Sequence, residues 1–345
     1  MPGYPIPGVA LDEFASRDQI VDYFIHYAEK IGAPVRCGVE VTALHRTGVG
    51  FRAETSQGPI EAANVVVATG PFQRPVVPAI VPPEAGMFQV HASGYRNPDQ
   101  PPDGAVLVVG AGSSGAQIAD ELLRAGRRVY LSVGRHVRPP RRYRGRDFVW
   151  WMDQQGLWHL PAGEEARLHL PLAFSGAYGG VSVDYRRLAA GGLVLVGRAE
   201  GFRDGVMYFG ADLAANLAAG DASCRAFMDQ ADAFAAERGL DLPEDSEARA
   251  MEPDPSCVVD PIRELRLRDS GIGTIIWATG YTLDFDWLKI PVFDEHGAPV
   301  HRRGVTSVPG LYFLGLAWLS KRTSSFICGV GHDAAWLAEQ IAERG

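Results

Sequence analysis

Apolar residues recur at helical spacing near the start of the chain and in short continuous runs further along. Between Ser16 and Gly32, large apolar side chains share one face of a helix, at positions 20, 23, 24, 27 and 31. Ser16 and Gln19 have capping-box spacing, which predicts the start of this helix, and Gly32 predicts its end. A strand is expected over 34–44.

Short apolar runs predict further strands, with helical patterns between them. Residues 51–55 and 60–63 predict a hairpin, and 64–68 fits a buried strand of a parallel sheet. The elements expected further on are strand 105–109, helix 113–125, strand 128–133, strand 193–196, helix 213–238 with a break near Gly220-Asp221, strand 273–278, strand 311–314 and helix 332–344. Strands that alternate with helices predict an α/β fold.

Composition and charge narrow the class of protein. The 345 residues, 46% hydrophobic and 21% charged, are typical of a globular protein of about two domains. A net charge of −8 argues against nucleic-acid binding. The four cysteines lie far apart, which argues against a zinc site or a CxxC redox pair and favours a reducing cytoplasm. We see neither a signal peptide nor an apolar run long enough to span a membrane, so we expect a cytoplasmic protein.

One glycine-rich motif carries the clearest chemistry. The expected strand 105–109 runs into Gly110, Gly112 and Gly115, which form GxGxxG before the expected helix 113–125. The first glycine permits a tight turn, the second leaves room for a pyrophosphate, and the third allows close packing of helix and strand. The N–H groups at the start of the helix attract phosphate. We therefore expect dinucleotide binding here, with Ser113 and Ser114 among the contacts; a glycine-rich turn in an unrelated α/β domain is the alternative.

The residues that follow favour NADPH over NADH. NAD sites carry an acidic residue about 20 positions on, at the end of the second strand. Residues 127–146 contain no acid but eight arginines, at 127, 128, 135, 138, 141, 142, 144 and 146. We expect Arg135 and Ser132 to contact the 2′-phosphate of NADPH. Two or three of the arginines are expected instead to pair with carboxylates of the acidic loop 241–256.

Two apolar strands share one ending. Residues 65–70 and 275–280 both finish in Ala-Thr-Gly, and they flank the GxGxxG motif. With further segments at 2–5, 16–18, 91–96 and 309–315, these strands make the sequence similar to flavin-dependent monooxygenases, and more closely to bacterial FAD/NAD(P)-dependent oxidoreductases of the CzcO type. The resemblance covers essentially the whole chain.

The resemblance implies an α/β fold with two dinucleotide-binding, Rossmann-like domains. An NADPH domain, residues 84–272, would be inserted into an FAD domain made of residues 1–83 and 273–345. The implied FAD contacts are Val41, Thr69, Gly70, Thr279, Gly280 and Gly315. His91 and Tyr95 resemble the end of a family fingerprint at the domain junction, although its preceding Phe-x-Gly is replaced by Ala-Gly-Met. A hydrogen-bonded structural histidine is the alternative for His91.

The resemblance also implies an FAD-binding strand, GxGxxG and helix upstream of Met1, so that the FAD domain here is N-terminally truncated. The expected consequence is a sheet that exposes apolar neighbours. Two explanations are open: a truncated gene product, or a chain that has lost flavin binding or receives the missing unit in trans. The Asp that usually follows the last flavin-side strand is also replaced, by the stretch 315–318.

The implied activity is that of an FAD- and NADPH-dependent monooxygenase, in which hydroperoxyflavin oxygenates a small organic substrate with O2. An NADPH-dependent flavin reductase that passes electrons to a partner would show the same motifs. A non-catalytic NADPH-binding protein is the alternative from another class, and a homo-oligomer is left open. No residue is expected to act as a metal ligand or nucleophile, because the cofactor carries the chemistry.

Two aromatic and hydroxyl-rich segments have alternative interpretations. Trp150 and Trp151 would either line a substrate or nicotinamide pocket or pack between domains, the latter being favoured. The hydroxyl run Thr323-Ser324-Ser325 would either face the flavin or cap the following helix.

Overall fold

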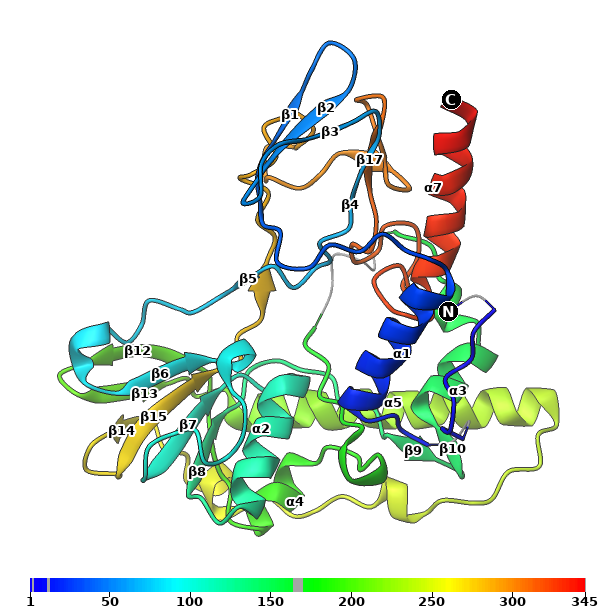
Figure 1. Ribbon diagram of the computed structural model, residues 1–345. Coiled ribbons are helices and arrows are strands. Elements are labelled where there is room, and N and C mark those ends of the chain that lie inside the picture. The colour runs from blue at the N-terminus through cyan, green and yellow to red at the C-terminus, as the bar shows by residue number, and fades with distance from the viewer. Residues whose placement is uncertain (2, 11–12, 164–169, 345) are drawn as a thin grey trace. The chain divides into compact units, whose positions relative to one another are not determined.

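The computed structural model describes residues 1, 3–10, 13–163 and 170–344. The chain divides into two compact units (Figure 1). Unit 1 comprises Met1–Arg74, Gly156–Leu168 and Tyr281–Gly345, and unit 2 comprises Pro75–Gln155 and His169–Gly280. Within the described residues, no helix is both long and apolar enough to cross a membrane.

A five-stranded parallel sheet forms the centre of unit 2. Its order is β11 (Val194–Val196), β8 (Val129–Ser132), β7 (Ala105–Val109), β15 (Ile272–Trp277), β6 (Phe88–His91). All five residues of β7 are buried, and alternate side chains enter two different cores. This is why β7 is apolar at every position rather than at every second one.

Each face of this sheet has its own cover. Val106 and Val108 pack in the core under α2 (Ser113–Arg124) and α4 (Tyr185–Ala190). The opposite face packs against an antiparallel meander of β12 (Ala199–Arg203), β13 (Val206–Phe209) and β14 (Glu264–Arg266). Both faces of the sheet are therefore shielded from water, as is typical of a parallel sheet.

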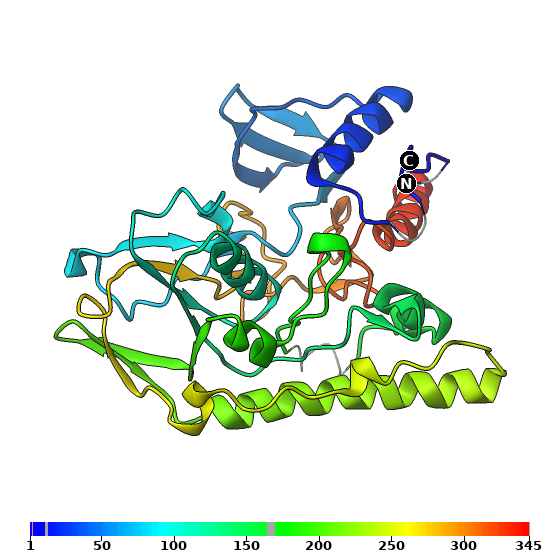
Figure 2. The same cartoon turned by 90° about the horizontal axis from the view of Figure 1, so that it is seen from below.

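Helix α5 (Leu213–Arg238) is continuous over 26 residues, so the expected break at Gly220-Asp221 is wrong. A Cβ at position 220 would lie 2.5 Å from Nε2 of His136, so glycine is needed here for close packing rather than for a bend. Asp221 is buried and pairs with Arg138 and Arg186 at 2.5 Å each. Figure 2 shows α5 as the long yellow-green helix, with the segment that follows it running back alongside.

Several short elements pack around α5. Helix α3 (Phe148–Gln154) follows the two-stranded β9 (Arg142–Tyr143) and β10 (Arg146–Asp147). Trp151 on α3 is fully buried against Met228 and Ala231 of α5, and its indole N–H donates to the Tyr143 carbonyl at 3.0 Å. The remaining short helices of unit 2 are η1 (Pro83–Ala85), η2 (Ala92–Gly94), η5 (Ala177–Gly179), η6 (Glu247–Arg249) and α6 (Ser256–Val259).

Unit 1 contains two small sheets and two longer helices. The antiparallel sheet is β1 (Val41–Arg46), β2 (Phe51–Thr55), β3 (Ile60–Ala62), and the second is β17 (His301–Arg302), β18 (Val305–Thr306), β19 (Leu311–Phe313), β4 (Val65–Val67). Strands β19 and β4 are parallel. The helices are α1 (Arg17–Lys30), α7 (Val330–Arg344) and the short η3 (Leu157–His159); β5 (Arg74–Pro75) and β16 (Tyr281–Thr282) stand where the chain passes between units.

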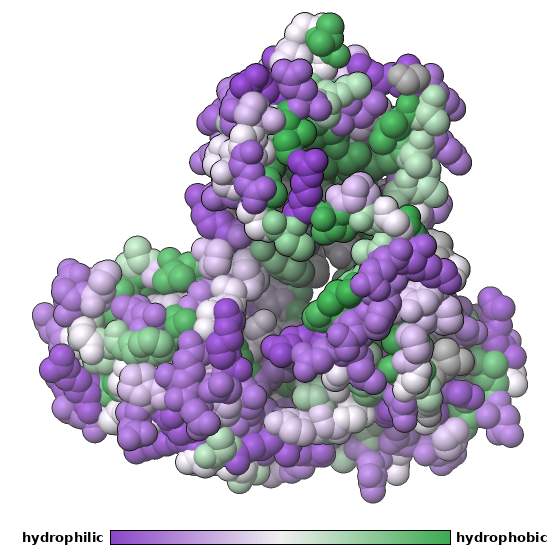
Figure 3. All heavy atoms as spheres, in the orientation of Figure 1, coloured by the Kyte–Doolittle hydropathy of each residue, from purple (hydrophilic) through white to green (hydrophobic). Residues whose placement is uncertain are grey.

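The N-terminal helix confirms its local signals. Ser16 caps α1 and forms the expected capping box with Gln19, and Gly32 follows its last turn with a φ of +61°. Tyr23 is buried, but other apolar residues of α1 are exposed, among them Phe24 and Ile25. Val41 at the start of β1 and Val49 in the turn between β1 and β2 are exposed as well, and Figure 3 shows apolar atoms at the tip of this hairpin. The strand expected over 34–44 begins only at Val41.

Strand β4 is less buried than expected. Val67 is buried, whereas Val66 is 39% exposed, because β4 is the last strand of its sheet among the described residues. Val66 is thus an exposed apolar residue at the edge of this sheet.

The limits of the compact units do not coincide with the domain limits expected from the resemblance, which stay a prediction. Strand β15 was expected to open the second part of the FAD domain, but it pairs with β7 and β6 and so belongs to unit 2. The boundaries accordingly fall at 74/75 and 280/281 instead of 83/84 and 272/273. Residues 156–168, within the expected NADPH insertion, join unit 1, where Ala162 N–H donates to the Ser320 carbonyl.

Candidate functional site

The glycine-rich turn of unit 2 has the geometry that a dinucleotide requires. Gly110 has a φ of +115°, and a Cβ there would collide with the carbonyl oxygen of Ala278. A Cβ at Gly115 would collide with the Gly110 carbonyl, so this glycine allows α2 to approach β7. Gly112 is the N-cap residue and offers no side-chain acceptor, which leaves the first N–H groups of α2 without a side-chain cap.

The serines of this turn have different surroundings. The Ser113 hydroxyl donates to the Leu172 carbonyl at 2.6 Å, so it ties α2 to the segment that follows Pro171. A Cβ at Gly112 would lie 3.3 Å from the Pro171 Cβ, which shows that this segment lies close to the turn. Ser114 instead lines an open cavity along α2.

Ser132 and Arg135, expected side by side on the 2′-phosphate, differ sharply in exposure. Ser132 is buried; its hydroxyl donates to the Gly197 carbonyl at 2.9 Å and accepts from the Ala199 N–H at 3.0 Å. Its O–H donor and one of its two acceptor lone pairs are therefore used within the fold. Arg135 follows β8 and is exposed, and its side chain has no hydrogen bond or ion pair to any described residue.

The other arginines of the 127–146 cluster have structural partners. Arg127 donates to four backbone carbonyls of residues 98–104. Arg138, Arg141 and Arg144 pair with carboxylates, but these belong to Asp184, Asp221, Asp147 and Asp232 and not to the loop 241–256. The Arg144 guanidinium also donates to two backbone carbonyls of that loop, those of residues 242 and 243. These ion pairs thus use Asp221 and Asp232 of α5 and the N-cap residues Asp147 and Asp184 of α3 and α4, whereas the loop carboxylate of Asp245 accepts from the Arg144 backbone N–H at 3.1 Å.

His91 ends β6 and links two strand ends of unit 2. Its Nδ1 accepts from the Ser93 N–H at 3.1 Å, so the proton resides on Nε2, which donates to the Gly280 carbonyl at 3.0 Å. Burial lowers the pKa of His91, while the hydrogen bond to Gly280 partly opposes this. The imidazole is thus a neutral structural bridge, the alternative interpretation of His91.

Thr279 and Gly280, two of the implied FAD contacts, lie in unit 2. The Thr279 hydroxyl donates to the Val76 carbonyl at 2.5 Å, and the Gly280 carbonyl receives both His91 and the Val76 N–H. The hydrogen bonds of Thr279 and Gly280 therefore join the chain at Val76 to the end of β15, within the fold of unit 2.

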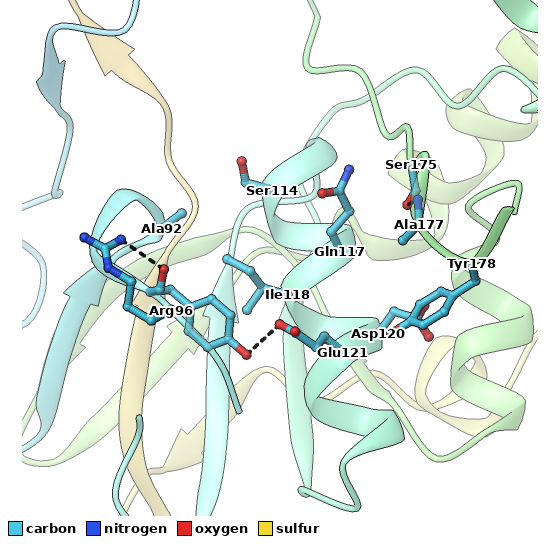
Figure 4. A pocket seen from close by; sticks show the side chains of 11 residues that line it. Ala92, Arg96, Ser114, Gln117, Ile118, Asp120, Glu121, Ser175, Ala177 and Tyr178 are labelled. Carbon is cyan, nitrogen blue, oxygen red and sulfur yellow. Dashed lines mark hydrogen bonds between the residues drawn. The ribbon is translucent and has the colours of Figure 1, made fainter. Parts of the chain in front are cut away.

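A cavity of about 350 Å³ lies along the outer side of α2 (Figure 4). Its residues come from α2, from the segment after β6 and from the segment around η5. The Tyr95 hydroxyl donates to Glu121 at 2.9 Å across this cavity, and burial together with this acid raises the pKa of Tyr95. Asp120 and Glu121 make this lining unfavourable for phosphate.

The implied FAD contacts of unit 1 stand at the ends of two parallel strands. Gly70 follows β4 and Gly315 follows β19, with φ of +70° and +76°, and a Cβ at either would meet no atom within 4 Å. The exposed Thr69 accepts from the Gln73 side chain at 2.9 Å. Val41 is exposed at the start of β1, in the other sheet.

Two further alternatives are resolved by packing. Trp151 lies inside the core of unit 2 rather than in a pocket or between domains, and the ring of Trp150 faces the Arg146 guanidinium at 5.1 Å. Ser324 does not cap α7. Its hydroxyl accepts from the N–H groups of Ser320 and Lys321, and the residue is fully buried.

Comparison with known proteins places this architecture in a family. A CzcO-like oxidoreductase of Geobacillus kaustophilus is 33% identical over 344 residues, which cover 97% of this chain and 82% of that protein. This chain belongs to the CzcO-like oxidoreductases. The CzcO oxidoreductase of Bacillus subtilis is 29% identical over 346 residues, with 97% and 83% of the two chains covered.

A broader family and a solved structure agree with this assignment. Residues 6–147 of this CzcO-like chain match the family described as pyridine nucleotide-disulphide oxidoreductase. A flavin-containing monooxygenase from Stenotrophomonas maltophilia is 18% identical and has a TM-score of 0.63, with 100% of this chain and 82% of that chain covered. The likeness confirms the expected α/β fold with Rossmann-like domains.

The CzcO-like chain is therefore an oxidoreductase with relatives among pyridine-nucleotide enzymes and flavin-containing monooxygenases, and these homologues imply FAD and NADPH as cofactors. The glycine-rich turn of unit 2 fits a dinucleotide, because Gly110 and Gly115 stand where a Cβ would collide with backbone. In unit 1 the open positions Gly70 and Gly315, at adjacent carboxyl ends of parallel strands, fit the edge at which α/β sheets bind ligands.

Proposed function

We propose that this CzcO-like oxidoreductase oxidises NADPH in preference to NADH and acts as a monooxygenase on a small organic substrate. The observation that carries the NADPH preference is Arg135: it is exposed and unpartnered among the described residues at the carboxyl end of β8. An arginine at this strand end accommodates a 2′-phosphate, whereas an acid would bind the 2′-hydroxyl of NADH.

The residues of unit 2 have distinct roles in this proposal. The first N–H groups of α2, from Ser113 onward, would bind the pyrophosphate, and Gly112 adds no side chain to the turn, beside which Pro171 lies. Arg135 would bind the 2′-phosphate. His91 would act as a positioning residue, since its bond to Gly280 fixes the end of β15.

In unit 1, Thr69, Gly70 and Gly315 would hold FAD, with Val41 toward the adenine. FAD supplies the redox chemistry between NADPH and O2 when it is bound. The glycines would let the cofactor approach the backbone closely, because neither has a side chain or a neighbour in the way. A phosphate-binding turn of the GxGxxG kind occurs once in this sequence, in unit 2.

Relatives support oxygenation as the reaction. A flavin-containing monooxygenase of Amanita muscaria is 36% identical over 110 residues, which cover 29% of this chain. A flavin reductase that hands electrons to a partner is the second candidate carried by the same residues. The four cysteines, at 37, 224, 257 and 328, lie far apart in the sequence and include no CxxC pair of the kind that a dithiol relay uses.

Exchange of Arg135 tests the nucleotide preference. Arg135→Asp should raise the KM for NADPH at least about tenfold and leave that for NADH nearly unchanged, because the carboxylate repels only the additional phosphate. Arg128→Asp is the matched control, since Arg128 is also exposed but lies at the other end of β8. Equal changes in both KM values would contradict the assignment.

Labelled oxygen tests the reaction type. With FAD, NADPH and a small sulfide or amine present, a monooxygenase places one oxygen-18 atom from labelled O2 in the product. Electron transfer to a quinone without labelled product would favour the reductase. NADPH binding without FAD binding or NADPH oxidation would identify a non-catalytic NADPH-binding chain.

A further inference from the structure

Arg198 and Arg135 follow the carboxyl ends of two neighbouring strands of the unit 2 sheet. Arg198 follows β11, the neighbour of β8 in the parallel sheet, and the register pairs Val196 with Ser132. Arg198 is thus two residues beyond a strand end, and Arg135 is three residues beyond the adjacent one. Neighbouring strands lie about 4.8 Å apart, and ligands of open α/β sheets bind at their carboxyl ends.

The backbone around Arg198 is fixed to β8 on both sides. The carbonyl of Gly197 accepts from the Ser132 hydroxyl at 2.9 Å. The N–H of Ala199 donates to the hydroxyl oxygen of Ser132 at 3.0 Å. The Arg198 N–H donates to a carboxylate oxygen of Asp212 at 3.0 Å. The fold therefore holds the root of this side chain in place, which lowers the entropy that a ligand must overcome.

The side chain of Arg198 is left without a partner. It is exposed, and within the described part of the chain it makes no ion pair, hydrogen bond or ring contact. This sets it apart from arginines such as Arg138 and Arg186, whose guanidinium groups are buried in carboxylate pairs. Of the arginines at this sheet edge, Arg135 shares this freedom.

We propose that Arg198 binds the 2′-phosphate of NADPH together with Arg135, as a second determinant of NADPH specificity. This inference rests on the proposed NADPH preference and adds to the site a residue that follows β11. Two guanidinium groups from adjacent strands can each donate to the dianionic phosphate, which is a charge-assisted contact. NADH would gain nothing from Arg198.

A pair of small ligands isolates this contact from turnover. The compounds 2′,5′-ADP and 5′-AMP differ only in the 2′-phosphate, and their dissociation constants for the full chain can be measured by titration calorimetry. Arg198→Ala should weaken 2′,5′-ADP binding about tenfold and change 5′-AMP binding less than about twofold. Arg198→Lys should restore part of the loss because it keeps the charge.

Arg203→Ala is the matched control, since Arg203 is exposed on the β12–β13 hairpin, where it pairs with the adjacent Asp204 and faces the Tyr208 ring. Equal losses for both ligands in Arg198→Ala would show stacking on adenine and overturn the proposal, as would a loss no larger than that of Arg203→Ala. If the unmodified chain does not bind 2′,5′-ADP more tightly than 5′-AMP, the proposed NADPH preference is wrong as well. If Arg198→Ala keeps the full preference for 2′,5′-ADP, only the role of Arg198 is overturned.

Discussion

Helices α1 and α2 show two different ways in which a helix is specified. Helix α1 has a full capping box and an amphipathic pattern, yet Tyr23 is its sole buried residue and Ile25 is 51% exposed. Helix α2 has no side-chain cap, yet Ile118, Ala119 and Leu122 are buried against the sheet. Local signals thus account for α1, whereas α2 is held by tertiary packing.

The difference extends to the two units. The central sheet of unit 2 has apolar cores on both faces, and its ligand edge carries fixed strand ends. In unit 1, β4 exposes Val66, and the strand ends at Gly70 and Gly315 are open. The proposed nucleotide site of unit 2 therefore rests on a core of its own, whereas the strand ends proposed to hold FAD in unit 1 are less enclosed.

The largest expected contrast compares the apolar faces of the two helices. Leu122→Ala should lower the free energy of unfolding by about 3–4 kcal/mol, because it leaves a cavity in a closed core. Ile25→Ala on α1 should change it by about 0.5 kcal/mol or less. Urea unfolding followed by circular dichroism measures both, and a large loss in Ile25→Ala would remove the contrast.

A smaller contrast compares two glycines. Gly115→Ala should cost about 2 kcal/mol or more, since its Cβ would collide with the Gly110 carbonyl, and it should also weaken 5′-AMP binding. In Gly70→Ala the new Cβ would meet no atom within 4 Å. The free energy of unfolding should therefore fall only by the cost of a positive φ, about 1 kcal/mol. Thermal unfolding of the two variants gives the comparison; similar melting temperatures would contradict it.

The smallest expected effect is one of pH. Burial lowers the pKa of His136 in unit 2 below the 6.5 of the unfolded chain. The unfolded state then binds the proton more readily, so the stability contributed here is present above about pH 6.5 and is lost as the pH falls through the lower folded pKa. His136→Gln should flatten the acid side of the stability profile, measured by urea unfolding at several pH values. An unchanged slope would exclude His136 as its source.

The sequence alone predicted those features that depend on neighbouring residues. The strand, glycine turn and helix around Gly110 and Gly115 were found because steric need and sequence spacing coincide. The capping box at Ser16 was found for the same reason. The class of enzyme followed from a resemblance along the whole chain, which the comparisons confirm.

Features that depend on distant partners were not predictable in this way. Gly220-Asp221 has the composition of a helix break, but its glycine makes room for His136 and its acid binds Arg138, 83 residues away. Ser132 looked available to a ligand because nothing in the sequence reveals its bonds to residues 197 and 199. Arg198 could not be related to Arg135 from the sequence, because only the parallel pairing of β11 with β8 shows that the two arginines follow neighbouring strands.

The segment 156–168 has a consequence for how this protein can be divided. Because it joins unit 1 from within the sequence of unit 2, the polypeptide passes between the units four times, at 74/75, 155/156, 168/169 and 280/281. A protease that cuts at one crossing releases neither unit, since three covalent connections persist. Gene fragments cut at a single point would likewise carry portions of both units, and a stand-alone nucleotide-binding unit would require residues 75–155 and 169–280 to be rejoined by a new linker.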